Sequence, residues 1–124
     1  MAQARLTTTV AVRPLPEHTD AAQHLHGFAY TLTIRNTGEV AAQLIGRHWH
    51  ISDHRGGVQQ VRGLGLVGHQ PMLQPGEQFE YTSWATLPTP AGTMRGEYFC
   101  VTEDAHFFQA PIAEFALVMP RTLH

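Results

Sequence analysis

The chain reads Gly63-Leu-Gly-Leu-Val-Gly68 and continues as His69-Gln-Pro-Met-Leu-Gln-Pro-Gly76. Its first six residues match GxGxxG, the pattern of dinucleotide-binding loops, which requires a helix to begin directly after the last glycine. Pro71 and the Pro75-Gly76 pair argue against that helix, because proline lacks a backbone N–H and its ring kinks a helical segment. The stretch therefore predicts a glycine loop inside a β-rich fold, and no Rossmann-type dinucleotide site.

The segment from Phe28 to Ile34 alternates large and small side chains with a period of two, which is typical of a half-buried strand. Similar segments recur along the chain, each bracketed by Gly, Pro, Asn or Asp, and no amphipathic helical pattern is visible. About eight short strands predict an all-β, antiparallel sandwich or barrel. Strands are expected at Leu6–Val12, Phe28–Ile34, Val40–Ile51, Val58–Arg62, Phe79–Ala85, Met94–Thr102, His106–Gln109 and Ile112–Met119, with irregular structure at Pro14–Gln23 and Gly68–Glu77.

Two aromatic positions favour an immunoglobulin-like sandwich over a barrel. Trp49 falls on the third expected strand, where such folds often hold a core tryptophan, and Tyr98 stands two residues before Cys100, the spacing of a tyrosine corner. Ordinary aromatic packing is the alternative for both residues. Cys100 is the only cysteine, so it has no intrachain disulfide partner and is expected to be a small buried hydrophobic residue.

Composition narrows the function classes. The 124 residues carry a formal net charge of −2, and all 8 basic residues are arginine. The absence of lysine excludes a lysine Schiff base and the lysine of a P-loop, and the absence of a cationic cluster argues against nucleic-acid binding. The first residues lack the apolar segment of a secretion signal, and no apolar run approaches the ~20 residues of a membrane span. We therefore expect a cytoplasmic protein that binds neither nucleic acid nor membrane.

The glycine loop has two interpretations. Successive glycines can turn several backbone N–H groups toward one anion, so Gly63, Gly65 and Gly68 could bind phosphate or pyrophosphate. Charge-assisted hydrogen bonds would come from Arg62 and from Arg47 or His69. The alternative is structural: the glycines let a crossover segment lie close to the sandwich, with the intervening apolar side chains packed beneath it.

Arg47 itself raises a question of phase, because it is in phase with Ile45, Trp49 and Ile51 and should point inward with them. A buried guanidinium needs a partner. The first explanation is a bulge at Gly46 that shifts the phase; the alternatives are an internal partner or a recess that Arg47 lines.

The 9 histidines include two H-x-H pairs, His24/His26 and His48/His50. Residues two apart on a strand share a face at ~6.5–7 Å, so two imidazoles can converge on one transition metal. His48 and His50 are the candidate ligands for a divalent cation, which His54 or His69 could complete. The alternative is that these histidines are solvated or packed, since HExxH, cysteine pairs and carboxylates at ligand spacing are missing.

No catalytic group stands out, and we expect no enzyme. Cys100 lies in the middle of a strand, a packed setting that does not favour a thiolate. Ser83 lacks a nucleophile elbow, and Glu77 and Glu80 lie near a turn on a solvated face. These residues form no acid–base pair or triad.

Ordered motifs from about Phe28 to Pro120 resemble the bacterial ApaG family. The matching residues are Arg47-His-Trp49, Val61-x-Gly-x-Gly-x-Val-Gly68, Gln70-Pro71, Pro75-Gly76, Phe79-x-Tyr-Thr-Ser83, Thr89-Pro-x-Gly92, Met94-x-Gly96-x-Tyr98, Pro111-Ile112 and Phe115-x-Leu117. Leu64 and Leu66 depart from the usual loop and make it more apolar. The resemblance implies one ApaG domain over residues 1–124 with short flexible termini, folded as a fibronectin type III-like or immunoglobulin-like sandwich.

The same resemblance implies a genetic link to cobalt and magnesium tolerance and no settled enzymatic activity. Related domains in eukaryotic F-box and polymerase-delta-interacting proteins imply protein binding. The leading hypothesis is thus a non-catalytic module that presents a sheet face and the glycine loop to an unidentified protein partner, without a cofactor. The alternative is binding of phosphate or pyrophosphate at the loop, or of a divalent cation at the histidines. Homodimerisation through an edge strand is a further expectation, because a sandwich leaves edges to be paired.

Overall fold

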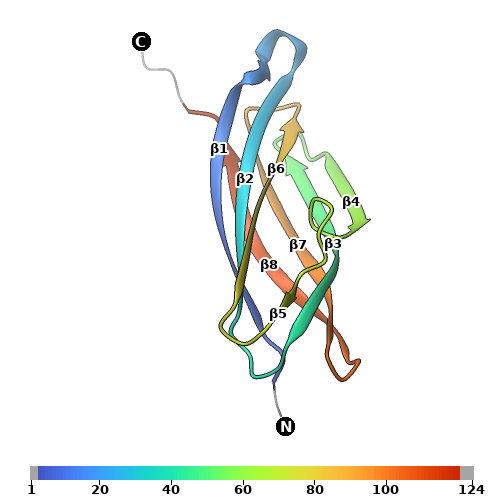
Figure 1. The fold of residues 1–124 in the computed structure, drawn as a ribbon. Coiled ribbons are helices and arrows are strands. Elements are labelled where there is room, and N and C mark those ends of the chain that lie inside the picture. Colours follow the sequence, from blue (N-terminus) through green and yellow to red (C-terminus); the bar gives the residue numbers. More distant parts are fainter. Residues whose placement is uncertain (1–2, 121–124) are drawn as a thin grey trace.

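The computed structural model describes residues 3–120, and most of them lie in β-strands (Figure 1). These residues contain no α-helix, so no helix among them could cross a membrane. The expectation of flexible termini falls partly on residues 1–2 and 121–124, which lie outside the described range. The elements in chain order are β1 (Leu6–Asp20), the 3-10 helix η1 (Ala21–Gln23), β2 (Leu25–Asn36), β3 (Ala42–Asp53), β4 (Val58–Leu64), β5 (Met72–Leu73), β6 (Gln78–Leu87), β7 (Ala91–Thr102) and β8 (Phe107–Val118).

The strands form two antiparallel sheets that pack face to face (Figure 1). One sheet has the order β1-β2-β6, and the other has the order β4-β3-β7-β8 with the short β5 paired to β3. Every pairing is antiparallel. The predicted all-β, antiparallel sandwich of a single domain is confirmed.

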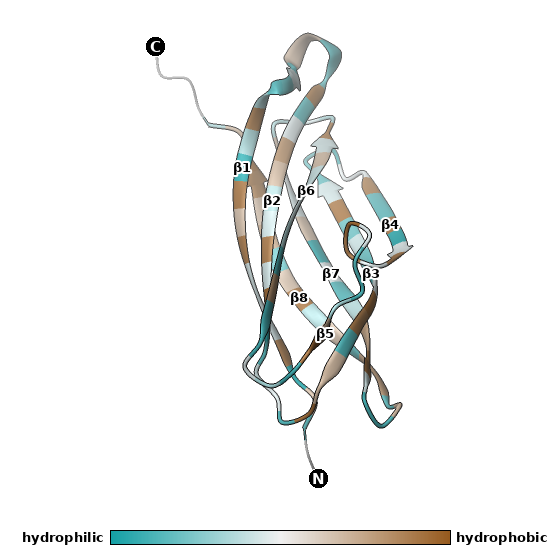
Figure 2. Ribbon diagram, viewed as in Figure 1, coloured by the Kyte–Doolittle hydropathy of each residue, from teal (hydrophilic) through white to brown (hydrophobic). Residues whose placement is uncertain are grey.

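The core lies between the sheets and follows from the alternation of side chains. Bands of apolar and polar residues alternate along the strands in Figure 2. From β2, Phe28, Leu32 and Ile34 are fully buried, and Met94 and Tyr98 of β7 meet them from the opposite sheet. Burial of each large apolar side chain contributes roughly 1.5–3 kcal/mol, so this alternation is the main force that holds the two sheets together.

Trp49 is part of this core, as expected, with its ring at edge-to-face angles to Tyr98 and Phe115. Cys100 is buried, also as expected. The hydroxyl of Tyr98, however, pairs with the hydroxyl of Tyr81 across the two sheets, rather than with a backbone group as in a tyrosine corner. The tyrosine-corner interpretation is therefore wrong in its hydrogen bond.

Two prolines misled the prediction of strand boundaries. The segment Pro14–Gln23 was expected to be irregular, yet β1 continues to Asp20, and its register with β2 is interrupted only between Leu15 and Asp20. In the same way β8 runs through Pro111 as one strand, where two were expected. Both are edge strands, where a proline can sit without removing a hydrogen bond from the ladder. The short β5 also lies in a segment expected to be irregular.

The predicted bulge in β3 exists, but it does not turn Arg47 outward. The register of β3 with β7 shifts between Leu44 and Gly46, so Ile45 is the additional residue. Before the bulge Leu44 faces the core, and after it Trp49 does. Arg47 stays in phase with Trp49 and points to the space between the sheets, where it finds partners in the glycine loop. Our preference for the bulge as the explanation was wrong; the alternatives, an internal partner and a recess, describe Arg47 better.

Candidate functional site

The glycine loop is a tight hairpin turn at the end of β4. Leu66 donates its N–H to the His69 carbonyl at 2.7 Å, and His69 donates back at 3.1 Å. The two central residues, Val67 and Gly68, both have positive φ, 50° and 85°, which is the pattern of a type I′ turn. The chain therefore turns back as a hairpin after Gly68, and the helix required by the dinucleotide interpretation is not formed.

Val67 is in an unusual conformation for its type. A β-branched residue with left-handed backbone angles is an outlier, and such positions cost about 1–3 kcal/mol each. Asn-Gly is the usual pair in this turn. Val67 is nevertheless 56% exposed, and Leu64 at the start of the loop is 79% exposed. The loop thus exposes two apolar side chains to solvent, and at Val67 the backbone adopts a conformation that valine disfavours.

Arg47 holds this loop from beneath. Its Nη1 donates to the carbonyl of Gly65 at 3.0 Å and to that of Leu64 at 3.3 Å. A Cβ at Gly63 would lie 2.7 Å from the same nitrogen, so a larger residue there would displace the guanidinium. The guanidinium therefore binds loop carbonyl groups, which fixes the loop on β3.

The residues predicted to bind an anion lie in three different surroundings. Arg47 contacts the loop, whereas Arg62 lies opposite His48 on the outer face of the sheet, and the ring of His69 packs against Phe79 at 5.6 Å. Of the loop N–H groups, Gly65 donates to Ile45, and those of Leu66 and His69 bond to each other's carbonyls. The anion site at Gly63, Gly65 and Gly68 stays a prediction; Gly63 lies opposite Arg47 in the β3–β4 ladder, and Gly68 is at the turn.

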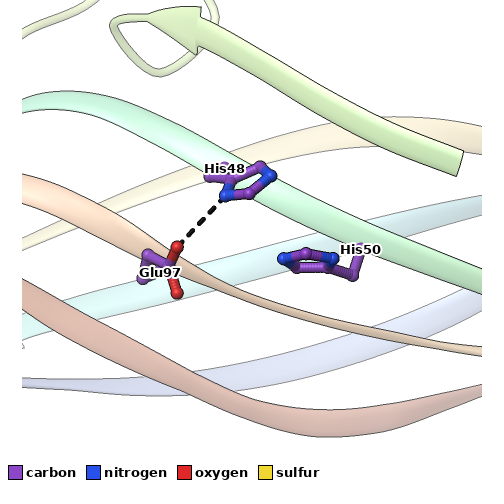
Figure 3. A group of neighbouring side chains, drawn as sticks. All are labelled: His48, His50 and Glu97. Atoms are coloured by element: carbon purple, nitrogen blue, oxygen red, sulfur yellow. Dashed lines mark hydrogen bonds and ion pairs between the residues drawn. The ribbon is translucent and has the colours of Figure 1, made fainter.

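His48 and His50 lie side by side on the outer face of β3 (Figure 3). Their ring centroids are 4.4 Å apart. Glu97 faces His48 from the neighbouring strand β7, with Oε1 at 3.1 Å from Nδ1 of His48. The sequence predicted the two histidines but missed Glu97. The signal was present, because Glu97 belongs to an expected strand, but the pairing of β3 with β7 cannot be read from spacing alone.

The other predicted histidines lie elsewhere. Among the described residues, the group of possible metal ligands is limited to His48, His50 and Glu97, without His54 or His69. His24 occupies a left-handed position after η1, and His26 is buried with an unpartnered Nδ1. The H-x-H spacing therefore produced a close pair in one of its two occurrences.

One side of the sandwich is open beside the loop. A cavity of about 300 Å³ lies between the inner faces of β3 and β4 and strand β6. Its polar lining includes Arg47, Ser83 and Tyr30, whose phenol has a raised pKa because of burial. A second hollow, of about 610 Å³, lies beside Trp84, whose ring stacks on His18. The sequence did not indicate that hollow, because its lining includes the part of β1 where the register with β2 is interrupted, between Leu15 and Asp20.

Comparison with known proteins places these features in a family. The model of the ApaG domain matches residues 16–102. Protein ApaG of Ralstonia nicotianae is 64% identical over 124 residues, which is the full length of both chains, and Protein ApaG of Bordetella pertussis is 59% identical over 119 residues, 96% of this chain and 91% of the relative.

The chain belongs to the ApaG family.

Solved structures agree with this membership. The crystal structure of an ApaA protein from Bordetella pertussis superimposes with a TM-score of 0.91 at 57% identity, covering 96% of this chain and 97% of that one. An X-ray structure of the structural genomics target SoR45 gives a TM-score of 0.89 at 38% identity, covering 96% of this chain and 90% of that one. The range matched by the ApaG model includes the glycine loop, Arg47 and the histidine pair.

The ApaG fold leaves the candidate nucleophile Cys100 inaccessible. Its side chain is 1% exposed, and burial raises the pKa of the thiol to about 12. A thiolate is the reactive form of cysteine, so this thiol is unreactive at neutral pH. Ser83 lies opposite Tyr30 on the neighbouring strand, a residue that offers no base at neutral pH.

Proposed function

We propose that this ApaG-family chain is a non-catalytic protein-binding module, and that its contact surface is the free edge of β4 together with the glycine loop. The main support for this proposal is the edge position of β4 and the exposure of its residues. This strand lies at the edge of the five-stranded sheet, and within residues 3–120 it pairs with β3 alone. Each of its residues is exposed apart from the half-exposed Gly63.

This edge lacks the usual protection of natural edge strands. Proteins commonly place proline, lysine or inward charges on such edges to prevent unwanted pairing. β1 has Pro14 and Pro16, and β8 has Pro111 and Glu114. β4 has none of these, and its only charged residue is Arg62. An unprotected edge in a small protein is suited to accept a strand from a partner.

The partner that fits is an extended peptide segment. Gly65 donates its N–H to Ile45, so the alternation of an antiparallel ladder directs the N–H groups of Arg62 and Leu64 toward the free edge. Main-chain hydrogen bonds there would supply affinity. Val61 lines the cavity on the open side and Leu64 is exposed at the loop, so apolar side chains of the peptide would have contacts on both faces.

The strained turn at Val67 is a second argument for the same contact surface. A valine at a left-handed position destabilises the fold, and more than half of the Val67 surface stays exposed to solvent. Strain of this kind is found where a residue serves binding. The link of the family to cobalt and magnesium tolerance would then act through the bound partner, and we expect the module to work in the cytoplasm.

The test uses peptides selected from a random phage-displayed library on the tag-free protein. Each selected peptide is titrated by fluorescence polarisation against wild type, Arg62→Pro and Arg62→Ala. Proline removes the outward N–H at a position that an edge strand tolerates, and alanine removes the same charge but retains the N–H. We expect Arg62→Pro to weaken binding about tenfold or more, and Arg62→Ala to weaken it by less than about threefold.

Three results would contradict the proposal. The selected peptides could bind Arg62→Pro as tightly as wild type, or they could perturb the NMR amide signals of β8 and leave those of β4 unchanged. Sedimentation could also show a dimer in which β4 is protected from hydrogen exchange, which would make a second copy of the chain the occupant. Circular dichroism and thermal melting of Arg62→Pro establish that lost binding is not lost folding.

A further inference from the structure

The outer face of β3 brings together three side chains that can bind one metal ion. His48 and His50 are two residues apart on β3, and Glu97 lies directly across from His48 on β7. One nitrogen of each histidine and one carboxylate oxygen lie within 4.8 Å of one another. Two ligand atoms on a tetrahedral zinc ion are about 3.4 Å apart, given bonds of roughly 2.0–2.1 Å. Small side-chain rotations would therefore close this group around an ion (Figure 3).

The hydrogen bonds of His48 suggest where the ion would bind. Its Nδ1 faces Oε1 of Glu97 at 3.1 Å, and its Nε2 faces Oε1 of Gln60 at 3.0 Å. Both partners are acceptors, but a neutral imidazole has only one N–H and can donate to only one of them. With Gln60 oriented in this way, a proton or a metal ion between Nδ1 and the carboxylate would satisfy both contacts.

Gln60 fits the role of a supporting residue. A histidine that binds a metal through one ring nitrogen almost always donates the other N–H to an oxygen, which fixes the ring and its tautomer. With a metal on Nδ1 of His48, the proton is on Nε2 and is donated to Gln60. The ring is also held by its surroundings, because His48 is only 5% exposed.

His50 is available as the second ligand. The hydrogen bonds of the described residues do not engage its ring, and it is partly exposed beside His48.

The ligand set also indicates the class of metal. Two imidazoles and one carboxylate suit borderline transition metals such as Zn²⁺, whereas Mg²⁺ and Ca²⁺ prefer oxygen ligands. Two arginines oppose the charge of any cation here: Arg95 lies across from His50, and Arg62 lies across from His48.

We propose that His48, His50 and Glu97 form a site for a divalent transition metal of the Zn²⁺ class, with Gln60 as its supporting residue. Its three ligands lie on β3 and β7, and Gln60 lies on β4, the strand whose free edge is proposed to bind a peptide.

Calorimetry with zinc chloride on tag-free protein tests the proposal, with magnesium chloride as the control metal. We expect one zinc ion per chain and no magnesium binding. His50→Gln and Glu97→Gln should each weaken zinc binding about tenfold or more, and Gln60→Leu should weaken it about tenfold. The matched control is His54→Gln, a histidine outside the group, which should bind zinc as wild type does. Arg95→Gln should strengthen binding, because it removes the opposing charge.

The NMR signals of the imidazole nitrogens give a second readout that does not depend on affinity. Zinc should shift Nδ1 of His48 and leave its Nε2 protonated. The proposal is wrong if wild type binds no zinc at millimolar concentration, or if His50→Gln and Glu97→Gln bind it as tightly as wild type. A loss of binding in His54→Gln equal to that in His50→Gln would likewise place the metal elsewhere.

Discussion

The phenol oxygens of Tyr81 and Tyr98 lie 2.9 Å apart in the buried space between the two sheets. Tyr81 belongs to β6 and Tyr98 to β7, so this hydrogen bond joins the two sheets directly. Each hydroxyl is the hydrogen-bond partner of the other. The stability cost of removing one hydroxyl therefore depends on whether the other is present.

Replacing both tyrosines by phenylalanine should cost less stability than the sum of the two single replacements. Tyr98→Phe leaves the buried hydroxyl of Tyr81 without a partner, at a cost of about 1–3 kcal/mol. The double variant removes both polar groups, so its cost should be clearly smaller than the sum of the two single costs. Urea denaturation of the four proteins measures this coupling. Additive costs would show that the hydroxyls do not stabilise each other.

The fold should lose stability at high pH. Burial raises the pKa of the Cys100 thiol from 9.0 to about 12, and burial also raises the pKa of Tyr81 and Tyr98. The unfolded chain therefore loses these protons at a lower pH than the folded chain. Their stabilisation is complete below about pH 9 and is lost as the pH rises toward 12.

The urea concentration at the midpoint of unfolding should accordingly decrease as the pH is raised from 9 to 11. Cys100→Ala removes one of the responsible groups and should make this fall less steep. In the same pH range a thiol reagent should label Cys100 of the native protein far more slowly than that of the unfolded protein. Equal labelling rates would mean that the thiol is not buried.

Val67→Asn should stabilise the protein. The change places Asn-Gly in the type I′ turn, where asparagine accepts the left-handed backbone at lower cost. The expected gain in the free energy of unfolding is about 1 kcal/mol. Leu64→Asn is the control, because it removes another exposed apolar side chain of the same loop without relieving backbone strain. If the two variants have the same stability, strain at Val67 is not the cause. Weaker peptide binding by the more stable variant would agree with the proposed contact surface.

Arg47→Ala should loosen the glycine loop. The guanidinium bonds to the carbonyls of Leu64 and Gly65 would be lost, at a cost of about 1 kcal/mol. Gly63→Ala should have a similar effect, since its methyl group would displace the same guanidinium. The two changes together should cost little more than either alone. Amide hydrogen exchange at Gly65, whose N–H bonds to Ile45, reports the loosening. Exchange that is unchanged in Arg47→Ala would contradict the role of Arg47.

Much of the fold could be predicted because its strands alternate in a simple way. The segment from Phe28 to Ile34 shows its buried face in every second residue, and the prolines after Gly68 exclude a helix by local sterics alone. The predicted strand boundaries were wrong at Pro14 and Pro111, because an edge strand cannot be recognised before the order of strands in the sheet is known.

The candidate site was less predictable, since it depends on register between distant strands. His48 and His50 are visible as a pair, but Glu97 and Gln60 join them only through the pairing of β3 with β7 and β4. The turn at Val67 was also hidden, because a valine carries no signal for left-handed backbone angles.

The extra residue at Ile45 determines which face of the sheet each later side chain of β3 points to. Even-numbered side chains face the core before it, and odd-numbered ones do so after it. Losing a single residue anywhere between Ile45 and Trp49 would rotate the remainder of the strand by half a turn. The indole would then meet water and the imidazoles would enter the interior. The length of this short segment is thus as strictly required as its composition, and tolerated changes there should be replacements, not insertions or deletions.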